Sequence, residues 1–388
     1  MKNIPKYILF TLLGALFGSV ITFLLMDNLG TTNKCRVTLK NNQFEPVIEA
    51  YETIKNEYYK DTDDKALING MIDGLMRATG DPHTTFFNEQ ETSDFLTEIN
   101  GSYYGIGAQI YQTDDNFVTI NRIFKNSPAE KSGLQVGDKF VSIDGQSMEG
   151  KTPTDISKIL RSSDTKKATL VMKRGDEEIV IEIEKSVVEI DSVNYEKLDN
   201  NIGYIEITTF SSLTDDQFTD TLSKLEKDNI KSLIIDLRGN AGGYLSTVTN
   251  IVSRFVDSKT VIYQIKQKNN TKKYYSLNNS KLDYKVVILV DGNSASASEI
   301  MASALQEQYG AKIVGKTTFG KGTVQEMKNL SNNTMFKYTN QEWLTSKGNS
   351  IEGVGVKPDY DIDLSEDYYN NPTRENDTQF QKAIELLK

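Results

Sequence analysis

The apolar positions in the C-terminal half of the chain fall into short runs separated by amphipathic stretches. Continuous runs rich in β-branched residues predict buried strands at 202–207, 231–237 and 284–290. The stretches at 213–225 and 296–308 are rich in helix-forming residues and predict helices. Strands that alternate with helices in this way predict a layered α/β domain.

Three further segments belong to the same half of the chain. Residues 261–277 are polar and contain several tyrosines, which predicts a hairpin or flap. Residues 335–344 predict a strand, and 377–387 predict a closing helix.

The middle of the chain predicts a small β-rich domain between residues 101 and 185. Its short strands are separated by turn signals, of which Asp144-Gly145 is a strong hairpin signal. One helix is expected within it, at 154–161. Ahead of this domain, apolar residues spaced three or four apart predict two helices, one from Phe44 onward and one at 66–78.

The N-terminus carries a predicted membrane anchor. Residues 8–26 contain no charged side chain and are long enough to cross the hydrocarbon core of a bilayer. Because Lys2 and Lys6 precede this run, the positive-inside rule places the N-terminus in the cytoplasm and the rest outside. A cleaved signal peptide is the alternative, although its apolar part is usually shorter and no Ala-x-Ala site follows. We therefore expect a single-pass protein of the cell membrane whose main part is extracytoplasmic.

Length and composition narrow the remaining possibilities. A chain of 388 residues is expected to contain two or three folded units. Its formal net charge of -10 argues against a nucleic acid partner, because no basic groove is evident that would neutralise phosphates. Cys35 is the only cysteine, so no intramolecular disulfide is expected. No grouping of His, Cys and Glu has the spacing of metal ligands, and we expect neither a metal nor another cofactor.

The turn between the strand at 284–290 and the next helix contains mostly small residues. Such a turn exposes a side chain beside the free N–H groups of a helix N-terminus, where a developing negative charge is stabilised. Ser296 is therefore a candidate nucleophile. The alternative is structural, because Ser296 and Glu299 also fit a capping box, in which a serine hydroxyl and a glutamate satisfy free N–H groups reciprocally.

A candidate base lies downstream. Lys321 is flanked by glycines, which let the backbone bend closely around it. The only histidine, His83, lies far upstream in an Asp-Pro-His-Thr turn, where a structural role is expected, so a Ser-Lys pair is favoured over a Ser-His-Asp triad. A lysine is a base only when it is neutral. Lowering its pKa from about 10.4 by roughly 3 units costs about 4 kcal/mol, which burial must supply.

Two segments, Ser294–Glu299 (SASASE) and Thr318–Gln325 (TFGKGTVQ), carry a family resemblance. In this order and at this spacing they resemble the catalytic region of the C-terminal processing peptidases, or tail-specific proteases, a family of serine peptidases. The resemblance implies that Ser296 is the nucleophile, that Lys321 is the general base, and that Gln325 orients this lysine.

The same resemblance extends to two other turns. The glycine-rich turn Asp236–Gly243 matches a turn that supplies one N–H group of the oxyanion hole, with Gly242 the first choice and Gly243 the second. The other donor implied is the N–H of Ala297, next to the nucleophile. The turn Asp81–Thr84 is similar to the turn in which the family's N-terminal helices end.

The β-rich domain resembles a PDZ domain. A glycine-bearing loop that turns successive N–H groups toward one point can capture a terminal carboxylate, while the peptide adds a strand to the sheet edge. The resemblance assigns this role to four residues: Tyr104, Gly105, Ile106 and Gly107. The alternative is a packing loop without a ligand.

The end of the helix at 154–161 provides a further hypothesis. Arg161 stands where the family often has a Leu-Arg-Gly segment, although Ser162 replaces the glycine here. A role of Arg161 in coupling tail binding to catalysis, as a gate, is therefore a hypothesis.

One motif would indicate nucleotide binding. Residues 310–317 (GAKIVGKT) match the phosphate-binding P-loop pattern. A helix precedes the motif where a strand should, and Ile313-Val314 predict a strand where the flexible loop belongs. We therefore do not expect nucleotide binding.

The patterns predict a multidomain α/β protein, and together with the resemblance they imply four parts. They are a cytoplasmic stub with the transmembrane anchor and the start of a linker (1–35), an N-terminal helical region (36–98), a PDZ domain (99–187), and an α/β serine peptidase core of the ClpP/crotonase type with a C-terminal helix (188–388).

The function expected is that of a membrane-anchored, extracytoplasmic serine endopeptidase. It would cleave protein substrates near their C-termini, with the PDZ domain binding substrate tails and gating activity. The alternative is a catalytically silent, membrane-anchored PDZ adaptor that binds protein C-termini. The resemblance also suggests a homodimer formed through the N-terminal helices and the C-terminal helix, whereas packing of these helices within one chain is the alternative.

Overall fold

The computed structural model describes residues 43–113, 117–161, 165–268, 270–277 and 281–388. The chain divides into two compact units, Met1–Met71 and Ile72–Lys388. The predicted membrane anchor at 8–26 lies outside the described residues. Among the helices that are described, none is both long and apolar enough to cross a membrane.

The described part of the first unit is helical, as the apolar spacing predicts. Helix α2 spans Glu45–Glu57, and α3 (Asp64–Arg77) begins in this unit and ends in the next. No residue of α2 is buried. The large apolar side chains of its stripe, Val47, Ile48 and Ile54, are all exposed. Among the described residues, the apolar stripe of α2 therefore stays largely exposed.

The second unit continues with a short strand and a helix that the apolar pattern did not predict. Strand β1 spans Thr85–Phe87, and α4 spans Glu89–Asn100. A capping box of Asn88 and Glu91 begins α4, and Gly101 ends it with a positive φ of 67°. These signals at the two ends of the helix are local and could have been found in the sequence.

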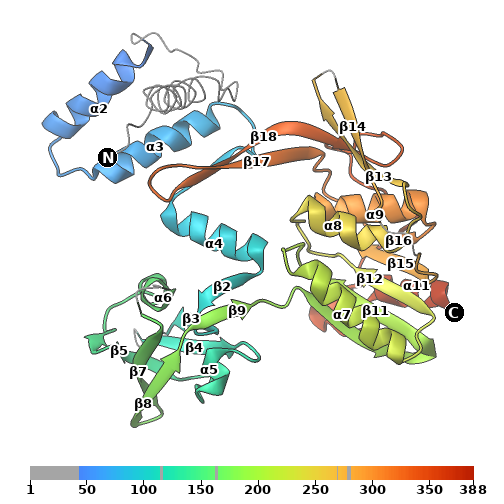
Figure 1. The fold of residues 1–388 in the computed structure, drawn as a ribbon, viewed down its shortest axis with the longest axis horizontal. Coiled ribbons are helices and arrows are strands. Elements are labelled where there is room, and N and C mark those ends of the chain that lie inside the picture. Colours follow the sequence, from blue (N-terminus) through green and yellow to red (C-terminus); the bar gives the residue numbers. More distant parts are fainter. Residues whose placement is uncertain (1–42, 114–116, 162–164, 269, 278–280) are drawn as a thin grey trace, which may run out of the picture. The chain divides into compact units, whose positions relative to one another are not determined.

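A small β domain follows, with the strands and the helix expected from its turn signals (Figure 1). Its elements are β2 (Ser102–Gly105), β3 (Ala108–Gln112), β4 (Val118–Ile123), α5 (Pro128–Lys131), β5 (Lys139–Ile143), β6 (Gln146–Ser147), α6 (Pro153–Arg161), β7 (Lys167–Arg174), β8 (Glu177–Glu184) and β9 (Ser186–Glu189). The main sheet has the order β3-β4-β5-β7-β8, with β6 paired to β5, while β2 pairs with β9. Its own core includes Ile120, Phe140, Ile156, Leu170 and Met172.

The C-terminal part contains the layered α/β core. Its elements are β10 (Val193–Leu198), β11 (Ile202–Ile207), α7 (Thr214–Lys227), β12 (Ser232–Asp236), α8 (Leu245–Ser253), β15 (Lys285–Val290), α9 (Ala297–Gln308), β16 (Lys312–Gly315), β19 (Tyr360–Asp361), α10 (Glu366–Asn370) and α11 (Thr378–Leu387), with the short 3-10 turn η2 (Asp199–Asn201) between β10 and β11. The sheet order is β10-β11-β12-β15-β16-β19, and every pair except β10 with β11 is parallel.

Successive residues of the central strands pack on opposite faces of this sheet. Leu233 and Ile235 of β12 share a core with α7, α8 and α9, whereas Ile234 packs with Phe380 and Ala383 of α11. Such a sheet with helices on both faces has strands that are apolar throughout. This explains why the continuous apolar runs predicted these strands.

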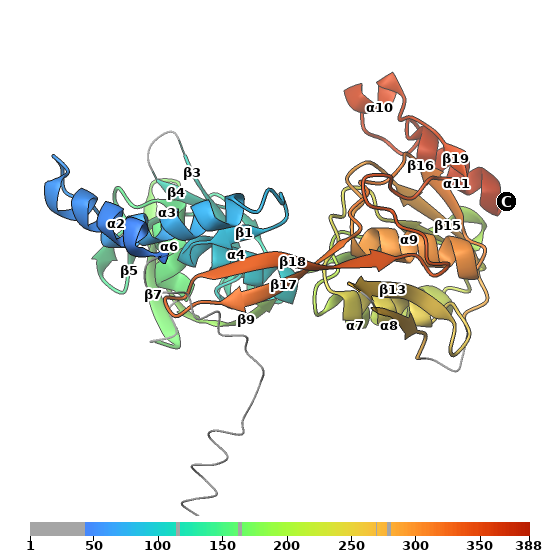
Figure 2. The ribbon, with the colours of Figure 1, turned by 90° about the horizontal axis from the view of Figure 1, so that it is seen from above.

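A second sheet carries the long strand β18 (Met335–Leu344), which pairs along its length with β17 (Thr323–Asn329). Figure 2 shows these two strands as one long ribbon. One end of β18 also pairs with β1, and the other pairs with β13 (Val261–Gln267). Strand β14 (Asn270–Tyr275) pairs with β13, which confirms the predicted hairpin.

The P-loop look-alike is part of the core sheet. Residues 312–315 form β16, and Lys316 is ion-paired with Asp361 (2.7 Å) and Asp363 (3.1 Å). The backbone that would have to wrap around phosphates is a strand, so this segment is no phosphate-binding loop.

Candidate active site

Ser296 lies at the junction of β15 and α9, with an unusual backbone conformation. Its φ of 54° and ψ of -112° lie outside the regions that residues with a Cβ atom ordinarily occupy. Such a conformation costs about 1–3 kcal/mol and persists only where the surroundings enforce it. The turn therefore needs firm attachments on both sides.

One set of attachments joins this turn to the glycine-rich turn after β12. The N–H of Ala295 donates to the carbonyl oxygen of Asn240 (3.0 Å), and the hydroxyl of Ser298 donates to the same oxygen (2.8 Å). The hydroxyl of Ser294 donates to the carbonyl oxygen of Leu237 (2.8 Å). These bonds attach residues on both sides of Ser296 to the neighbouring strand end.

A second attachment comes from the buried side chain of Glu299, in the first turn of α9. Its carboxylate accepts the N–H of Ser296 (2.8 Å), which is the glutamate half of the predicted capping box. The same carboxylate accepts the hydroxyl of Thr318 (2.6 Å) and the N–H groups of Gly320 (2.7 Å) and Lys321 (3.0 Å). One side chain therefore binds the backbone of both candidate catalytic residues.

The glycine-rich turn lies directly against Ser296. A Cβ atom on Gly242, whose φ is +108°, would lie 2.9 Å from the Cβ of Ser296 and 3.0 Å from the nitrogen of Ala297. Both the backbone angle and the close approach therefore require glycine at this position.

The N–H groups of this turn differ in their partners. The N–H of Gly242 donates to the side-chain oxygen of Asn240 (2.8 Å). Within the described residues, the N–H groups of Gly243 and Ala297 have no hydrogen-bond acceptor. The first-choice oxyanion donor is thus engaged in this conformation, whereas the second choice and Ala297 are unengaged.

The side chain of Lys321 is partly buried. Among the described residues, no hydrogen-bond or ion-pair partner reaches its Nζ. Burial lowers the pKa of Lys321 below its ordinary value, and the charge of Lys337 lowers it further. The carboxylates of Glu299, Asp81 and Glu352 act in the opposite direction without cancelling the shift. A lowered pKa is what a lysine needs to act as a base.

A cavity of about 670 Å³ brings the predicted residues together. Ser296, Lys321, Gln325 and Gly242 all line it, whereas Ala297 is fully buried and is not among the lining residues. Its walls also include apolar residues and one further glycine, namely Phe95, Ile99, Gly243, Leu245, Val324, Met327 and Trp343, together with polar residues and the charged Glu98 and Lys337. The cavity is thus large enough for several side chains of an extended peptide.

Gln325 lies in this cavity, but no hydrogen bond joins its amide to the amine of Lys321. Its amide donates to the hydroxyls of Thr323 (2.9 Å) and Thr339 (3.1 Å). The pairing of β17 with β18 sets Gln325 opposite Thr339 and Met327 opposite Lys337. Lys337 therefore also reaches the cavity, and its Nζ lies over the rings of Phe87 (5.2 Å) and Phe95 (5.4 Å).

His83 lies closer to the site than its turn motif indicates. It lines a second cavity, of about 490 Å³, together with Lys321 and Phe319. Burial lowers the pKa of His83, and the charge of Lys321 lowers it further. The backbone of the turn is fixed by Asp81, which accepts the N–H of His83 (2.9 Å) and the hydroxyl of Thr84 (2.6 Å).

The predicted tail-binding loop lies in the β domain, apart from these cavities. Gly105, Ile106 and Gly107 are buried, while Tyr104 lines a separate cavity of about 530 Å³. Arg161 lines the same cavity and stacks on the ring of Tyr103 (5.2 Å).

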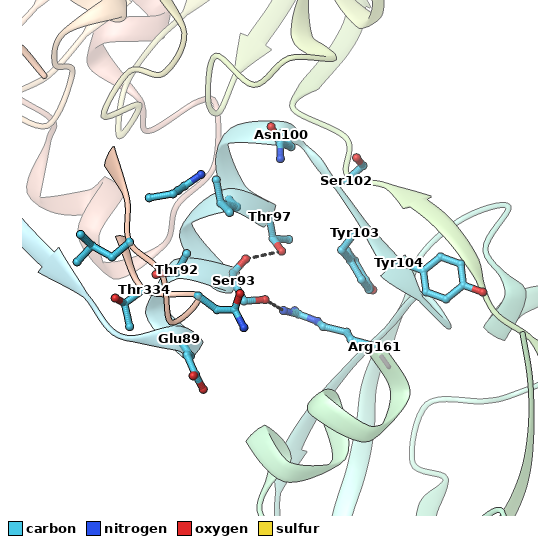
Figure 3. A pocket seen from close by; sticks show the side chains of 14 residues that line it. Glu89, Thr92, Ser93, Thr97, Asn100, Ser102, Tyr103, Tyr104, Arg161 and Thr334 are labelled. Carbon is cyan, nitrogen blue, oxygen red and sulfur yellow. Dashed lines mark hydrogen bonds between the residues drawn. The ribbon is translucent and has the colours of Figure 1, made fainter. Parts of the chain in front are cut away.

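Arg161 also reaches out of its own domain. Its guanidinium donates to Asp94 (3.2 Å) and Ser93 (3.3 Å) of α4, and Figure 3 shows the side chain extending toward this helix. Arg161 therefore connects the β domain to α4, the helix from which Phe95 enters the cavity around Ser296.

Sequence reasoning missed three contributions to this site. The local sequence indicates Glu299 only as a cap, because its contacts to Gly320 and Lys321 depend on how a distant turn packs. No sequence pattern places Phe95 or Lys337 at the site. The position of Phe95 depends on how α4 packs, and that of Lys337 depends on the register of β17 with β18. Throughout the described residues, no group of three or more His, Cys, Asp or Glu side chains could hold a metal ion.

Three family models match the chain. They are "Activating protease CtpB N-terminal domain" at residues 25–92, "PDZ domain" at 119–174 and "Peptidase family S41" at 201–362.

Individual relatives agree with these matches. The carboxy-terminal processing protease CtpA of Bacillus subtilis (strain 168) is 33% identical over 385 residues, 99% of this chain and 82% of that protein. CtpB of the same strain is 35% identical over 325 residues, 82% of this chain and 68% of that protein. The solved structure of a putative S41 protease from Bacteroides fragilis NCTC 9343 shares the fold, with a TM-score of 0.51 and 15% identity over 87% of this chain and 96% of that one.

Proposed function

Because this chain belongs to peptidase family S41 and is a C-terminal processing serine peptidase with a PDZ domain, we propose that Ser296 is its nucleophile and Lys321 its general base. The observation that carries this proposal is that both side chains line one cavity while a single carboxylate binds the backbone of both. The burial that lowers the pKa of Lys321 supports the role of base.

The reaction proceeds through an acyl-enzyme. Neutral Lys321 takes the hydroxyl proton of Ser296, and the oxygen attacks the carbonyl carbon of the peptide bond. The C–N bond then breaks, and the lysine ammonium returns the proton to the leaving amine. A water molecule, deprotonated by Lys321, hydrolyses the ester and releases the new C-terminal carboxylate. No metal or organic cofactor takes part in these steps.

The oxyanion of each tetrahedral intermediate needs N–H donors beside Ser296. We assign one to Ala297 and the other to the glycine-rich turn. The N–H of Gly243 is unengaged among the described residues, whereas the N–H of Gly242 would first have to leave Asn240. A structure with a peptide boronate on Ser296 decides between them, since only the true donor will lie within hydrogen-bond distance of the boronate oxygen.

The PDZ domain supplies a site for protein C-terminal tails. We assign the carboxylate-binding loop to Tyr104, Gly105, Ile106 and Gly107, and a gating role to Arg161. The contacts of Arg161 with Ser93 and Asp94 support the second assignment, because they connect the domain to α4. An Arg161→Ala variant that cleaves tail-dependent substrates at the normal rate would remove the gating role.

Two further parts of the proposal concern the whole protein. We place the peptidase outside the cell membrane, anchored by residues 8–26, on the strength of their uncharged sequence and the preceding lysines. Release of the protein from membranes by alkaline carbonate would contradict this anchor. We also propose a homodimer, supported by the exposed apolar stripe of α2, and sedimentation of the protein as a monomer at micromolar concentration would contradict it.

The central test compares proteolysis of an unfolded protein by the full-length chain and its variants. Ser296→Ala and Lys321→Ala should each lose at least about a thousandfold in activity, since general base and nucleophile act as one unit. Lys316→Ala is the matched control, because this lysine lies outside the cavity and is ion-paired at the surface. Equal proteolysis by all four proteins, or none by the wild type even with tail peptides added, would contradict the proposal.

A further inference from the structure

The carboxylate of Glu299 is completely buried and faces four hydrogen-bond donors. One oxygen accepts the N–H groups of Ser296 (2.8 Å) and Lys321 (3.0 Å). The other accepts the hydroxyl of Thr318 (2.6 Å) and the N–H of Gly320 (2.7 Å). Two turns that are more than twenty residues apart in sequence thus meet on one side chain.

The arrangement demands an acceptor at both oxygens. The three N–H groups can only donate. They face both oxygens, with Gly320 on one and Ser296 and Lys321 on the other, while the hydroxyl of Thr318 donates to Glu299 and accepts the N–H of Val356 (2.7 Å). An amide in place of the carboxylate would turn an NH₂ group toward at least one of these N–H groups and lose its bond. A capping role alone would need only the bond to Ser296.

We propose that Glu299 is a positioning residue that holds the nucleophile turn and the base turn in register, so that Ser296 and Lys321 meet in the working geometry. This inference rests on the Ser-Lys function proposed above. Displacing a reacting group by about 1 Å can cost about a hundredfold in rate. The strained backbone of Ser296 makes such a displacement easy once its N–H is released.

Glu299 also acts on Lys321 through its charge. The charged and titratable groups that affect Lys321 come from several elements: Asp81, His83, Glu299, Lys337 and Glu352. Of these, Glu299 is the largest influence that raises the pKa of Lys321, against burial and Lys337. Removing its negative charge therefore lowers the pKa of Lys321 further.

The test uses two variants of the full-length chain, Glu299→Gln and Glu299→Asp, with kcat, KM and the pH profile of kcat/KM measured for each. Glu299→Gln should lose about a hundredfold in kcat with little change in KM. Its profile should rise at lower pH than that of the wild type, because activity requires neutral Lys321. Glu299→Asp keeps the charge but is one methylene too short, so kcat should fall while the pH midpoint stays near the wild-type value.

Three outcomes would overturn the proposal. They are wild-type kcat in Glu299→Gln, a loss of kcat in a folded Glu299→Gln without movement of the pH midpoint, and failure of both variants to fold in a thermal melt. Ser296→Ala, measured alongside, separates this inference from its premise. If Ser296→Ala remains active, the Ser-Lys function fails whatever the Glu299 variants do.

Discussion

The turn that carries Ser296 and the turn that carries Lys321 meet at one cavity but differ in their backbone conformation and in the partners of their side chains. The serine turn is fixed through its backbone, in a strained conformation that bonds to Asn240 and Glu299 enforce. The lysine turn is also fixed at its backbone, yet among the described residues nothing bonds to the amine itself. A nucleophile needs a fixed position, whereas a lysine base needs surroundings that do not hold its proton.

The difference extends to the charges around the two residues. The serine turn is bonded to peptide groups and to the carboxylates of Asp291 and Glu299, which fix its orientation. At Lys321, burial and the charge of Lys337 lower the pKa, whereas the carboxylates of Asp81, Glu299 and Glu352 raise it. Its pKa is therefore set by a balance that single substitutions can move in either direction.

Among changes that leave both catalytic side chains in place, the largest effect is expected on the serine turn. Gly242→Ala would place a Cβ atom 2.8 Å from the carbonyl oxygen of Ala295 and 2.9 Å from the Cβ of Ser296, so the nucleophile turn must shift. We expect a loss of about a hundredfold or more in kcat/KM. The measurement is the rate of cleavage of an unfolded protein at fixed pH, with a thermal melt to confirm folding.

The matched control for this variant is Gly310→Ala. Gly310 has a similar positive φ of +86°, but a Cβ atom there meets open space, and it lies outside the cavity. It carries the same backbone strain, about 1–2 kcal/mol, without the contact to Ser296. If both variants lose activity equally, the loss comes from strain and not from displacement of the nucleophile.

The second prediction tests how the charge of Lys337 affects the pKa of Lys321. Lys337→Met removes a positive charge that lowers the pKa of Lys321, so that pKa should rise. Because activity needs neutral Lys321, the pH profile of kcat/KM should move to higher pH, and activity at neutral pH should fall by up to about tenfold. Lys337→Arg keeps the charge and should leave the midpoint in place. A midpoint that moves equally in both variants would contradict this electrostatic role.

The sequence predicted the serine side of the site better than the lysine side, for a physical reason. The strand at 284–290, the helix after Ser296 and the small residues between them are local signals, and the structure confirms both elements. The position of Lys337 instead depends on a hairpin register, and that of Phe95 on a helix far upstream. Such contacts leave no trace in the local pattern.

The same reason applies to the oxyanion donors and to the fold as a whole. The pattern of the glycine-rich turn could not reveal that the side chain of Asn240 would take the N–H of Gly242, because that bond depends on the folded turn. Helices and strands of the α/β core followed from apolar runs, since its sheet is covered on both faces. The long pairing of β17 with β18 could not be predicted in this way, because the register between two strands does not follow from the apolar pattern of either one.

The smallest expected effect concerns Gln325, which the family resemblance assigns to the lysine but which here bonds to Thr323 and Thr339. If the main role of Gln325 is to hold these two hydroxyls in place, Gln325→Leu should remove only two hydrogen bonds. The expected loss in kcat/KM is then about two- to tenfold. A loss as large as that of Lys321→Ala would mean that the amide turns to the amine in the working state. Gln325→Glu separates the two cases further. A new carboxylate in the cavity should raise the pKa of Lys321 and move the pH profile upward, by more the closer this side chain comes to the amine.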